Sequence, residues 1–145
     1  MTDRRLYSLL TLTGAAPFVA AALLPPLGFP TVGPFGSAVD LALSYGLAII
    51  CFLAGAHWAT FLYRRDQSPG NLFVASNLVV LGTWIPYLVA PVRVVACAMI
   101  LAFLALLFID YRLRQSGVIE SHYLTIRTTA TVLAVASLAA IAVLA

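Results

Sequence analysis

Five apolar segments occupy most of the chain, and each is long enough to cross a bilayer as an α-helix. We place them at about residues 6–24, 37–63, 71–90, 93–111 and 122–145. A membrane helix needs about 20 mainly apolar residues, and within lipid only helices and closed barrels satisfy every backbone polar group. The segments therefore predict an all-α integral membrane protein, a compact bundle of five transmembrane helices that forms one domain over residues 1–145.

The composition excludes the soluble alternatives. Apolar residues make up 63% of the chain and charged residues 9%, against about 45–50% and about 25% in soluble domains. All eight basic residues are arginines, and they stand at the ends of apolar segments rather than in a basic patch with interleaved aromatic residues. The net charge of +3 is therefore no sign of nucleic-acid binding, and the partner that the sequence indicates is the lipid bilayer.

The first apolar segment follows Arg4 and Arg5, as in a signal peptide. It is long enough to span a membrane, so we expect it to remain as a helix. Pro17 lies in its middle and should kink it, because proline removes a backbone hydrogen bond. The next stretch, 25–36, holds four prolines, three glycines and no charge, which predicts a loop.

The arginines also predict an orientation. Those expected on the side of the N-terminus are Arg4, Arg5, Arg64, Arg65, Arg112, Arg114 and Arg127. On the opposite side stands Arg93 alone. Cytoplasmic loops of membrane proteins carry the excess of basic residues. We therefore expect the N-terminus in the cytoplasm, or in the matrix of a mitochondrion, and the C-terminus outside.

Small residues predict where the helices pack closely. Cys51, Gly55 and Ala59 recur every four residues in the second segment, and Ala42 and Gly46 repeat this spacing before them. Membrane helices approach one another through such rows of small residues. We expect the row that contains Gly55 to be a helix contact.

Four polar residues, each in a different segment, are expected at one depth near the N-terminal side of the membrane. They are His57, Asn77, Asp110 and Arg127. Ionisable groups at membrane depth are costly and mark candidate functional positions. The shared depth predicts that the four side chains converge on a common pocket.

Each of these residues also has a structural interpretation. Asp110 can pair with Arg114 one turn later, and Arg127 can extend to the lipid headgroups. Asn77 can form a hydrogen bond between helices. His57 can be a packed structural histidine, or it can handle protons or a ligand because its ordinary pKa is near neutrality.

Catalytic and metal chemistry find little support in the sequence. The second histidine, His122, is expected at the edge of the last segment, which suits bis-histidine haem poorly. Cys51 and Cys97 form no metal-binding motif, so we expect buried free thiols. No serine with a surrounding motif is expected at the depth of His57. We therefore expect no enzyme activity, no catalytic residues, no metal and no cofactor.

Further residues are expected at the two membrane surfaces. Asp40 and Arg93 begin their segments on the side opposite the N-terminus and can pair there. Trp84 and Tyr87 lie nearby and fit an aromatic belt. Trp58 contributes to the belt on the other side, or it covers a pocket beside His57.

Residues 45–46 (YG) and 52–58 (FLAGAHW) resemble the signature of a small membrane family. This is the domain of unknown function 3429, which includes mitochondrial transmembrane protein 69. Its pattern is Tyr-Gly, then Phe-Leu-Gly-Gly-x-His-Trp-Gly, a later Asp near the end of a span, and Tyr-x-x-Leu-Arg. Asp110 and residues 123–127 (YLTIR) are similar to the later elements, with a slightly different spacing.

The resemblance covers nearly the whole chain, and alanines at positions 54 and 59 replace two family glycines. It implies a five-span, multi-pass protein of the bacterial inner membrane, or of the mitochondrial descendant of that membrane; in a bacterium the orientation predicted from the arginines places the C-terminus in the periplasm. It implies no known activity. It directs attention to a set of residues that comprises Tyr45, His57, Trp58, Asp110 and Arg127.

Together these observations predict a non-catalytic membrane protein that binds a protein partner or a small ligand through the polar cluster on the cytoplasmic side. The expected binding residues are Tyr45, His57, Trp58, Asn77, Asp110 and Arg127. The location that the resemblance implies is compatible with a role in respiratory-complex assembly. The alternative is a small proton-coupled carrier or channel that acts as a homo-oligomer.

Overall fold

The computed structural model describes residues 3–145, and helices dominate this part of the chain. The α-helices are α1 (Asp3–Thr13), α2 (Ala16–Leu23), α3 (Ala38–Tyr63), α4 (Leu72–Val89), α5 (Val92–Gln115) and α6 (Ser121–Leu144). Short 3-10 turns lie in the connections: η1 (Pro25–Leu27), η2 (Gly33–Phe35) and η3 (Arg65–Gln67). With α1 and α2 counted as one, five helices are long and apolar enough to cross a membrane. The predicted all-α, multi-pass architecture is confirmed at this level.

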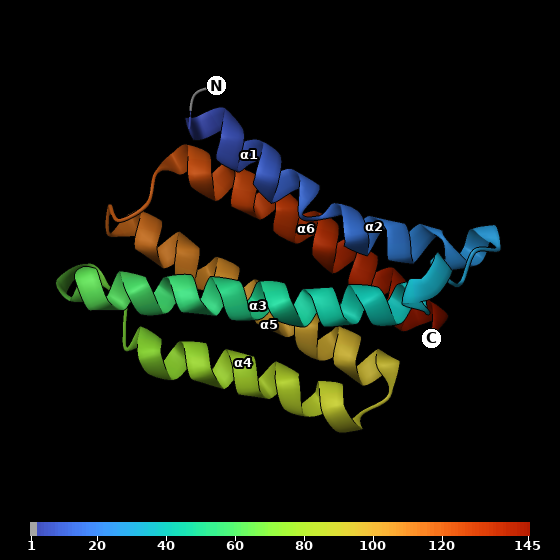
Figure 1. The fold of residues 1–145 in the computed structure, drawn as a ribbon. Coiled ribbons are helices and arrows are strands. Elements are labelled where there is room, and N and C mark those ends of the chain that lie inside the picture. The colour runs from blue at the N-terminus through green and yellow to red at the C-terminus, as the bar shows by residue number, and fades with distance from the viewer. Residues whose placement is uncertain (1–2) are drawn as a thin grey trace.

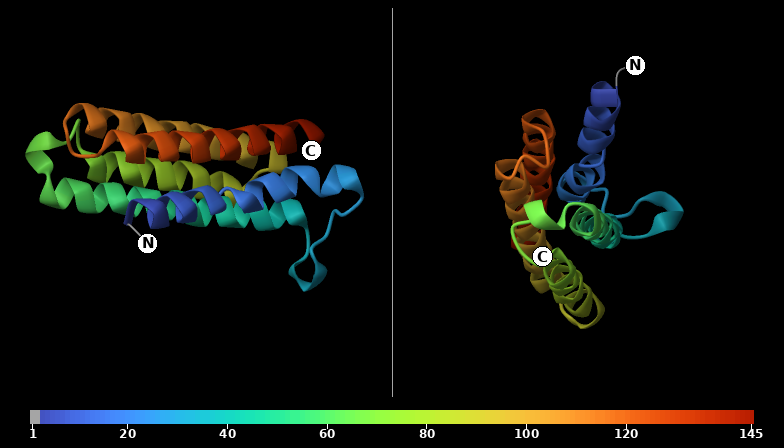
Figure 2. Two further views of the ribbon diagram at one scale, coloured as in Figure 1. Left: turned by 90° about the horizontal axis from the view of Figure 1, so that it is seen from above. Right: turned by 90° about the vertical axis from the view of Figure 1, so that its left-hand side faces the viewer.

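The helices lie side by side in an elongated bundle (Figure 1). Helix α5 packs against α3, α4 and α6, and α2 packs against α3 and α6. Helix α1 packs against α6, and the end-on view in Figure 2 places α1 and α4 at opposite edges of the bundle. The start of α1, the α3–α4 connection and the α5–α6 connection share one end (Figure 2). We call this the arginine-rich end, because six of the eight arginines lie at it and Arg127 lies close by.

The first membrane crossing is broken in its middle. Helix α1 ends at Thr13 and α2 begins at Ala16, so Pro17 occupies the first turn of the second half. At that position the missing N–H of proline costs no helical hydrogen bond. The predicted kink is confirmed, and the break lies just before Pro17.

Close packing in α3 follows the predicted row of small residues only at Ala42 and Gly46, which are buried. At Gly46 an added Cβ would lie 3.0 Å from Met99 Sδ and 3.1 Å from Phe18 Cε1. At Gly55 it would meet nothing within 4 Å. The prediction of a contact at Gly55 is therefore wrong. The buried face contains Ala42, Gly46, Ile50, Ala54 and His57, so the predicted row of 51, 55 and 59 lies one residue, or about 100°, away from it.

Two further predictions are corrected at the surface of the bundle. Cys51 and Cys97 are free, as expected, but both are exposed on the outer faces of their helices. Arg93 does not pair with Asp40, because its Nε donates to the carbonyl oxygen of Ala142 at 3.0 Å. The last carbonyls of a helix lack partners within that helix and attract cations.

Candidate functional site

Three polar side chains meet inside the bundle near its arginine-rich end. His57 lies six residues before the end of α3, Asp110 lies five before the end of α5, and Arg127 lies six after the start of α6. At about 1.5 Å per residue these positions are roughly 7–9 Å from the helix ends. We call these three residues the buried triad.

Asp110 is the centre of the triad. Its Oδ1 lies 2.7 Å from Nε2 of His57, and its Oδ2 accepts a hydrogen bond of 3.1 Å from Nε of Arg127. The exposed fractions of the three residues are only 4–5%. A charge buried this deeply needs a partner. The Asp110 carboxylate and the Arg127 guanidinium supply that partner for each other.

Helix register brings these side chains together. Each triad residue continues a buried apolar stripe of its own helix: His57 follows Ala54 on α3, Asp110 follows Leu106 on α5, and Arg127 precedes Ala130 and Thr131 on α6. Positions three or four apart share one helix face. The packing that buries the apolar stripes therefore also directs the polar groups inward.

Two structural interpretations offered by the sequence do not hold. Asp110 does not pair with Arg114, because both its oxygens face His57 and Arg127, while Arg114 Nε donates to Ser121 Oγ at 2.9 Å. Arg127 does not extend to the headgroups, because its guanidinium is held inside the bundle by Asp110.

The other three predicted binding residues lie apart from the triad. Asn77 is exposed on α4 and donates to the carbonyl oxygen of Phe73 in its own helix at 2.8 Å, so its place in the predicted cluster was wrong. Trp58 turns outward and packs on Phe73, with ring centroids 4.5 Å apart, and so does not cover a pocket beside His57. Tyr45 lies about three turns from His57 along α3.

A cavity of about 430 Å³ adjoins the triad. It is lined by α1, α2, α3, α6 and one residue of α5, and Arg127 forms part of its wall. On α3 the lining runs from Tyr45 to Ala56, and on α6 from Tyr123 to Ala134. Both stretches advance eleven residues, which makes the cavity about 16 Å long. We call it the slot.

Four buried polar atoms have no hydrogen-bond partner among the residues that the structure describes. They are Nη2 of Arg127, Oγ1 of Thr131, Nδ1 of His57 and Oγ of Ser76. Buried polar groups are nearly always paired, so each unpaired atom calls for an explanation. Arg127 and Thr131 both line the slot. Their two unpaired atoms are themselves buried, so the slot is reached by other atoms of these residues.

One protein-family model matches nearly the whole chain, including this region. The model of a family described as "Protein of unknown function (DUF3429)" matches residues 4–143. The chain belongs to the DUF3429 family. No curated protein and no solved structure matches it. The DUF3429 match includes the triad and every residue that lines the slot, and it confirms the resemblance seen in the sequence.

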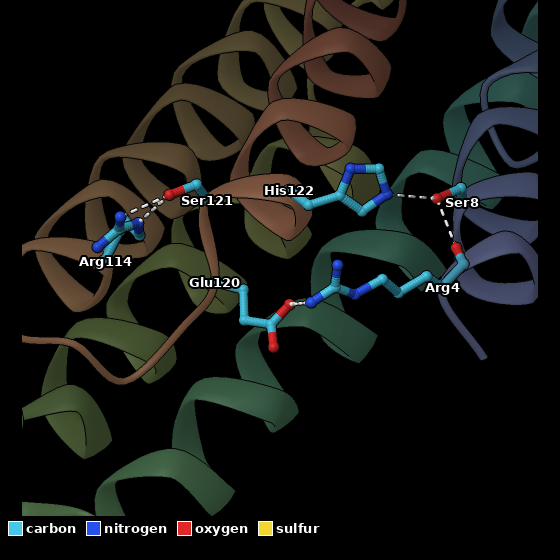
Figure 3. Close-up of polar contacts among 6 residues, drawn as sticks. All are labelled: Arg4, Ser8, Arg114, Glu120, Ser121 and His122. Atoms are coloured by element: carbon cyan, nitrogen blue, oxygen red, sulfur yellow. Dashed lines mark hydrogen bonds and ion pairs between the residues drawn. The ribbon is translucent and has the colours of Figure 1, made fainter. Parts of the chain in front are cut away.

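A second polar network, which the sequence did not predict, joins α1 to α6 at the arginine-rich end of this DUF3429 chain (Figure 3). Arg4 Nη2 donates to Glu120 Oε2 at 3.0 Å, and Ser8 Oγ lies 3.2 Å from His122 Nε2. We call these two contacts the α1–α6 latch. Its partners are more than a hundred residues apart, so no local pattern announces it.

The polar groups on the wall of the slot can form hydrogen bonds. Among the side chains that the structure describes, no three of His, Cys, Asp or Glu lie close enough to hold a metal ion. A guanidinium has only donors, whereas a hydroxyl both donates and accepts. The site that the DUF3429 fold builds is thus an apolar slot with a fixed donor, Arg127, on its wall.

Proposed function

We propose that this protein is a non-catalytic integral membrane protein that binds a small lipid-soluble ligand in the slot. One observation carries the proposal: Arg127, whose guanidinium makes a hydrogen bond through Nε to Asp110, lies on the wall of a cavity of about 430 Å³. Ligand pockets have volumes of about 300–1,000 Å³, mostly apolar walls and a few polar groups that fix orientation.

The rest of the triad supports Arg127 in this role. An arginine at membrane depth is costly unless it is paired, and Asp110 supplies the pairing charge through Nε. His57 holds the other carboxylate oxygen, which fixes the carboxylate in place. Nε of the guanidinium is thus used by the protein, and the residue still forms part of the slot wall.

A small ligand suits this geometry better than a protein partner. The triad side chains are buried, so the surface of another protein would not reach them. The slot extends to the outer surface of the bundle, because Leu10 of α1 and Phe52 of α3 line it and are 62% and 73% exposed. This opening faces the lipid, and a lipid-soluble molecule can enter there without crossing water.

For the membrane orientation, we propose that the arginine-rich end lies in the cytoplasm of a bacterial inner membrane and the C-terminus in the periplasm. The distribution of arginines between the two ends supports this, since basic residues favour the cytoplasmic side. The slot would then open into the cytoplasmic half of the bilayer.

A small proton-coupled carrier is the second candidate. The break between α1 and α2 favours it, because broken helices frame the binding sites of many transporters, and Gly14 and Ala15 at this break line the slot. The slot is about 16 Å long, however, against a hydrocarbon core of about 30 Å. Binding without transport is therefore the better-supported function.

The test is native mass spectrometry of the protein in a mild detergent. Ala56 lines the slot and Ala59, one turn away on the same exposed side of α3, does not. Ala56→Phe should fill part of the slot, and Ala59→Phe is the matched control. We expect a bound small molecule in the wild type and in Ala59→Phe and its loss from Ala56→Phe. Equal retention in both variants, or an empty wild type, would contradict the proposal.

A further inference from the structure

The length of the slot suits a ligand with an extended chain. The slot is about 16 Å long and holds about 430 Å³. Its deep end is lined by apolar side chains, among them Phe18, Phe103 and Ala134. A single hydrocarbon tail can lie along this stretch.

Aromatic side chains line the slot from end to end. Near the arginine-rich end Tyr7 and Tyr123 have ring centroids 6.1 Å apart. Near the other end Phe18 packs against Tyr45 and Phe103, with centroids 5.6 Å apart in each pair. Aromatic rings pack favourably against other rings in offset or edge-to-face arrangements. The end near Tyr7 and Tyr123 therefore suits a planar ring, with its tail directed toward Phe18.

The polar groups near this ring position can all donate a hydrogen bond. The hydroxyls of Tyr7 and Tyr123 both donate and accept, and Arg127, one turn deeper than Tyr123 on α6, can only donate. A hydrogen-bond acceptor beside the ring of the ligand would therefore find a donor here.

Charge balance favours a neutral acceptor over an anionic one. The charge of Arg127 is already matched by Asp110. Next to Tyr7 and Tyr123, Arg4 is likewise matched by Glu120. A carboxylate or phosphate would bring an unbalanced charge into this apolar site at a high desolvation cost. A carbonyl oxygen would not.

We propose that the slot binds a neutral, single-tailed lipid whose planar ring carries carbonyl oxygens, the chemistry of an isoprenoid quinone. One ring carbonyl accepts from the guanidinium of Arg127, and the tail extends toward Phe18. This inference rests on the proposed function of the slot as a ligand site, and it names the ligand class.

The experiment compares three probes with the same decyl tail: decylbenzoquinone, decylbenzene and decyl carboxylate. Binding to the protein in mild detergent is titrated by native mass spectrometry for the wild type, Ala56→Phe and Ala59→Phe. We expect decylbenzoquinone to bind the wild type and Ala59→Phe about equally, and Ala56→Phe at least about tenfold more weakly. A tenfold change is about 1.4 kcal/mol. Decylbenzene and decyl carboxylate should bind the wild type at least about tenfold more weakly than the quinone.

The outcomes separate the ligand class from the site. Preferential binding of the carboxylate, lost in Ala56→Phe, would overturn the neutral-carbonyl inference and leave the slot as a ligand site. Equal binding of decylbenzoquinone and decylbenzene would overturn the role of the acceptor. Quinone binding that Ala56→Phe does not weaken would place the probe outside the slot and overturn the inference. If no probe binds and the purified wild type carries no small molecule, the proposed function fails as well.

Discussion

The buried ion pair of the triad predicts a strong energetic coupling between two helices. Asp110→Leu removes the acceptor of both Arg127 and His57, and Arg127→Leu leaves the Asp110 carboxylate without its matching charge. Removing one member of a buried ion pair costs about 3–5 kcal/mol, which is a large part of a total stability of about 5–15 kcal/mol.

The double variant should lose less free energy of unfolding than either single variant. With both charges replaced by leucine, the remaining defect is the imidazole of His57, which loses its partner at about 1–3 kcal/mol. Two independent substitutions would together cost about 6–10 kcal/mol. The coupling energy between the two sites should therefore be at least about 3 kcal/mol.

The free energy of unfolding is measured by denaturant titration in detergent micelles, followed by circular dichroism, for the wild type, both single variants and the double variant. Glu120→Ala is the control, because the Arg4–Glu120 pair of the latch is exposed and should contribute less than about 1 kcal/mol. The reasoning would be refuted if the destabilisations of the two single variants simply added up in the double variant. It would also be refuted if Asp110→Leu lowered the free energy of unfolding no more than Glu120→Ala does.

Other measurements test the packing and the orientation. Gly46→Ala should destabilise the protein by about 1–3 kcal/mol, because its Cβ would lie 3.0 Å from Met99 Sδ. Gly55→Ala, which meets nothing within 4 Å, should be neutral or stabilising by up to about 1 kcal/mol. If Gly55→Ala lowered the thermal unfolding temperature more than Gly46→Ala, the assignment of the buried face of α3 would be contradicted. A reporter enzyme that is active only in the periplasm should be active after Ala145 and inactive in the α3–α4 connection, and the opposite pattern would invert the topology.

The sequence predicts how deep a residue lies along the bundle. It predicts only partly which way the side chain of that residue points around its helix. Counting residues from the ends of the apolar segments placed His57, Asp110 and Arg127 at one level, because a helix advances by a fixed rise. Whether a side chain points inward depends on which face is buried, and one residue turns that direction by about 100°. Asn77 was placed in the wrong direction for this reason. Trp58 turns outward, which fits its interpretation as a belt residue and not as the cover of a pocket beside His57.

The slot and the latch lay beyond prediction from one sequence. The slot exists because α1 packs against α6 and leaves space beside α3, and this spacing depends on the whole bundle. The latch joins Arg4 to Glu120 and Ser8 to His122 across most of the chain. Polar residues at segment ends are common, and their pairing across the bundle leaves no periodic signal.

The order of the triad along the chain has a consequence for how the protein is made. His57 leaves the ribosome first, Asp110 follows, and Arg127 is synthesised last. When α5 reaches the translocon, its carboxylate has an imidazole available but no cation, and the guanidinium that completes the pair is only seventeen residues behind. Because an unmatched charge enters lipid at a high cost, we expect α5 and α6 to leave the translocon together, as a hairpin whose charges are already neutralised.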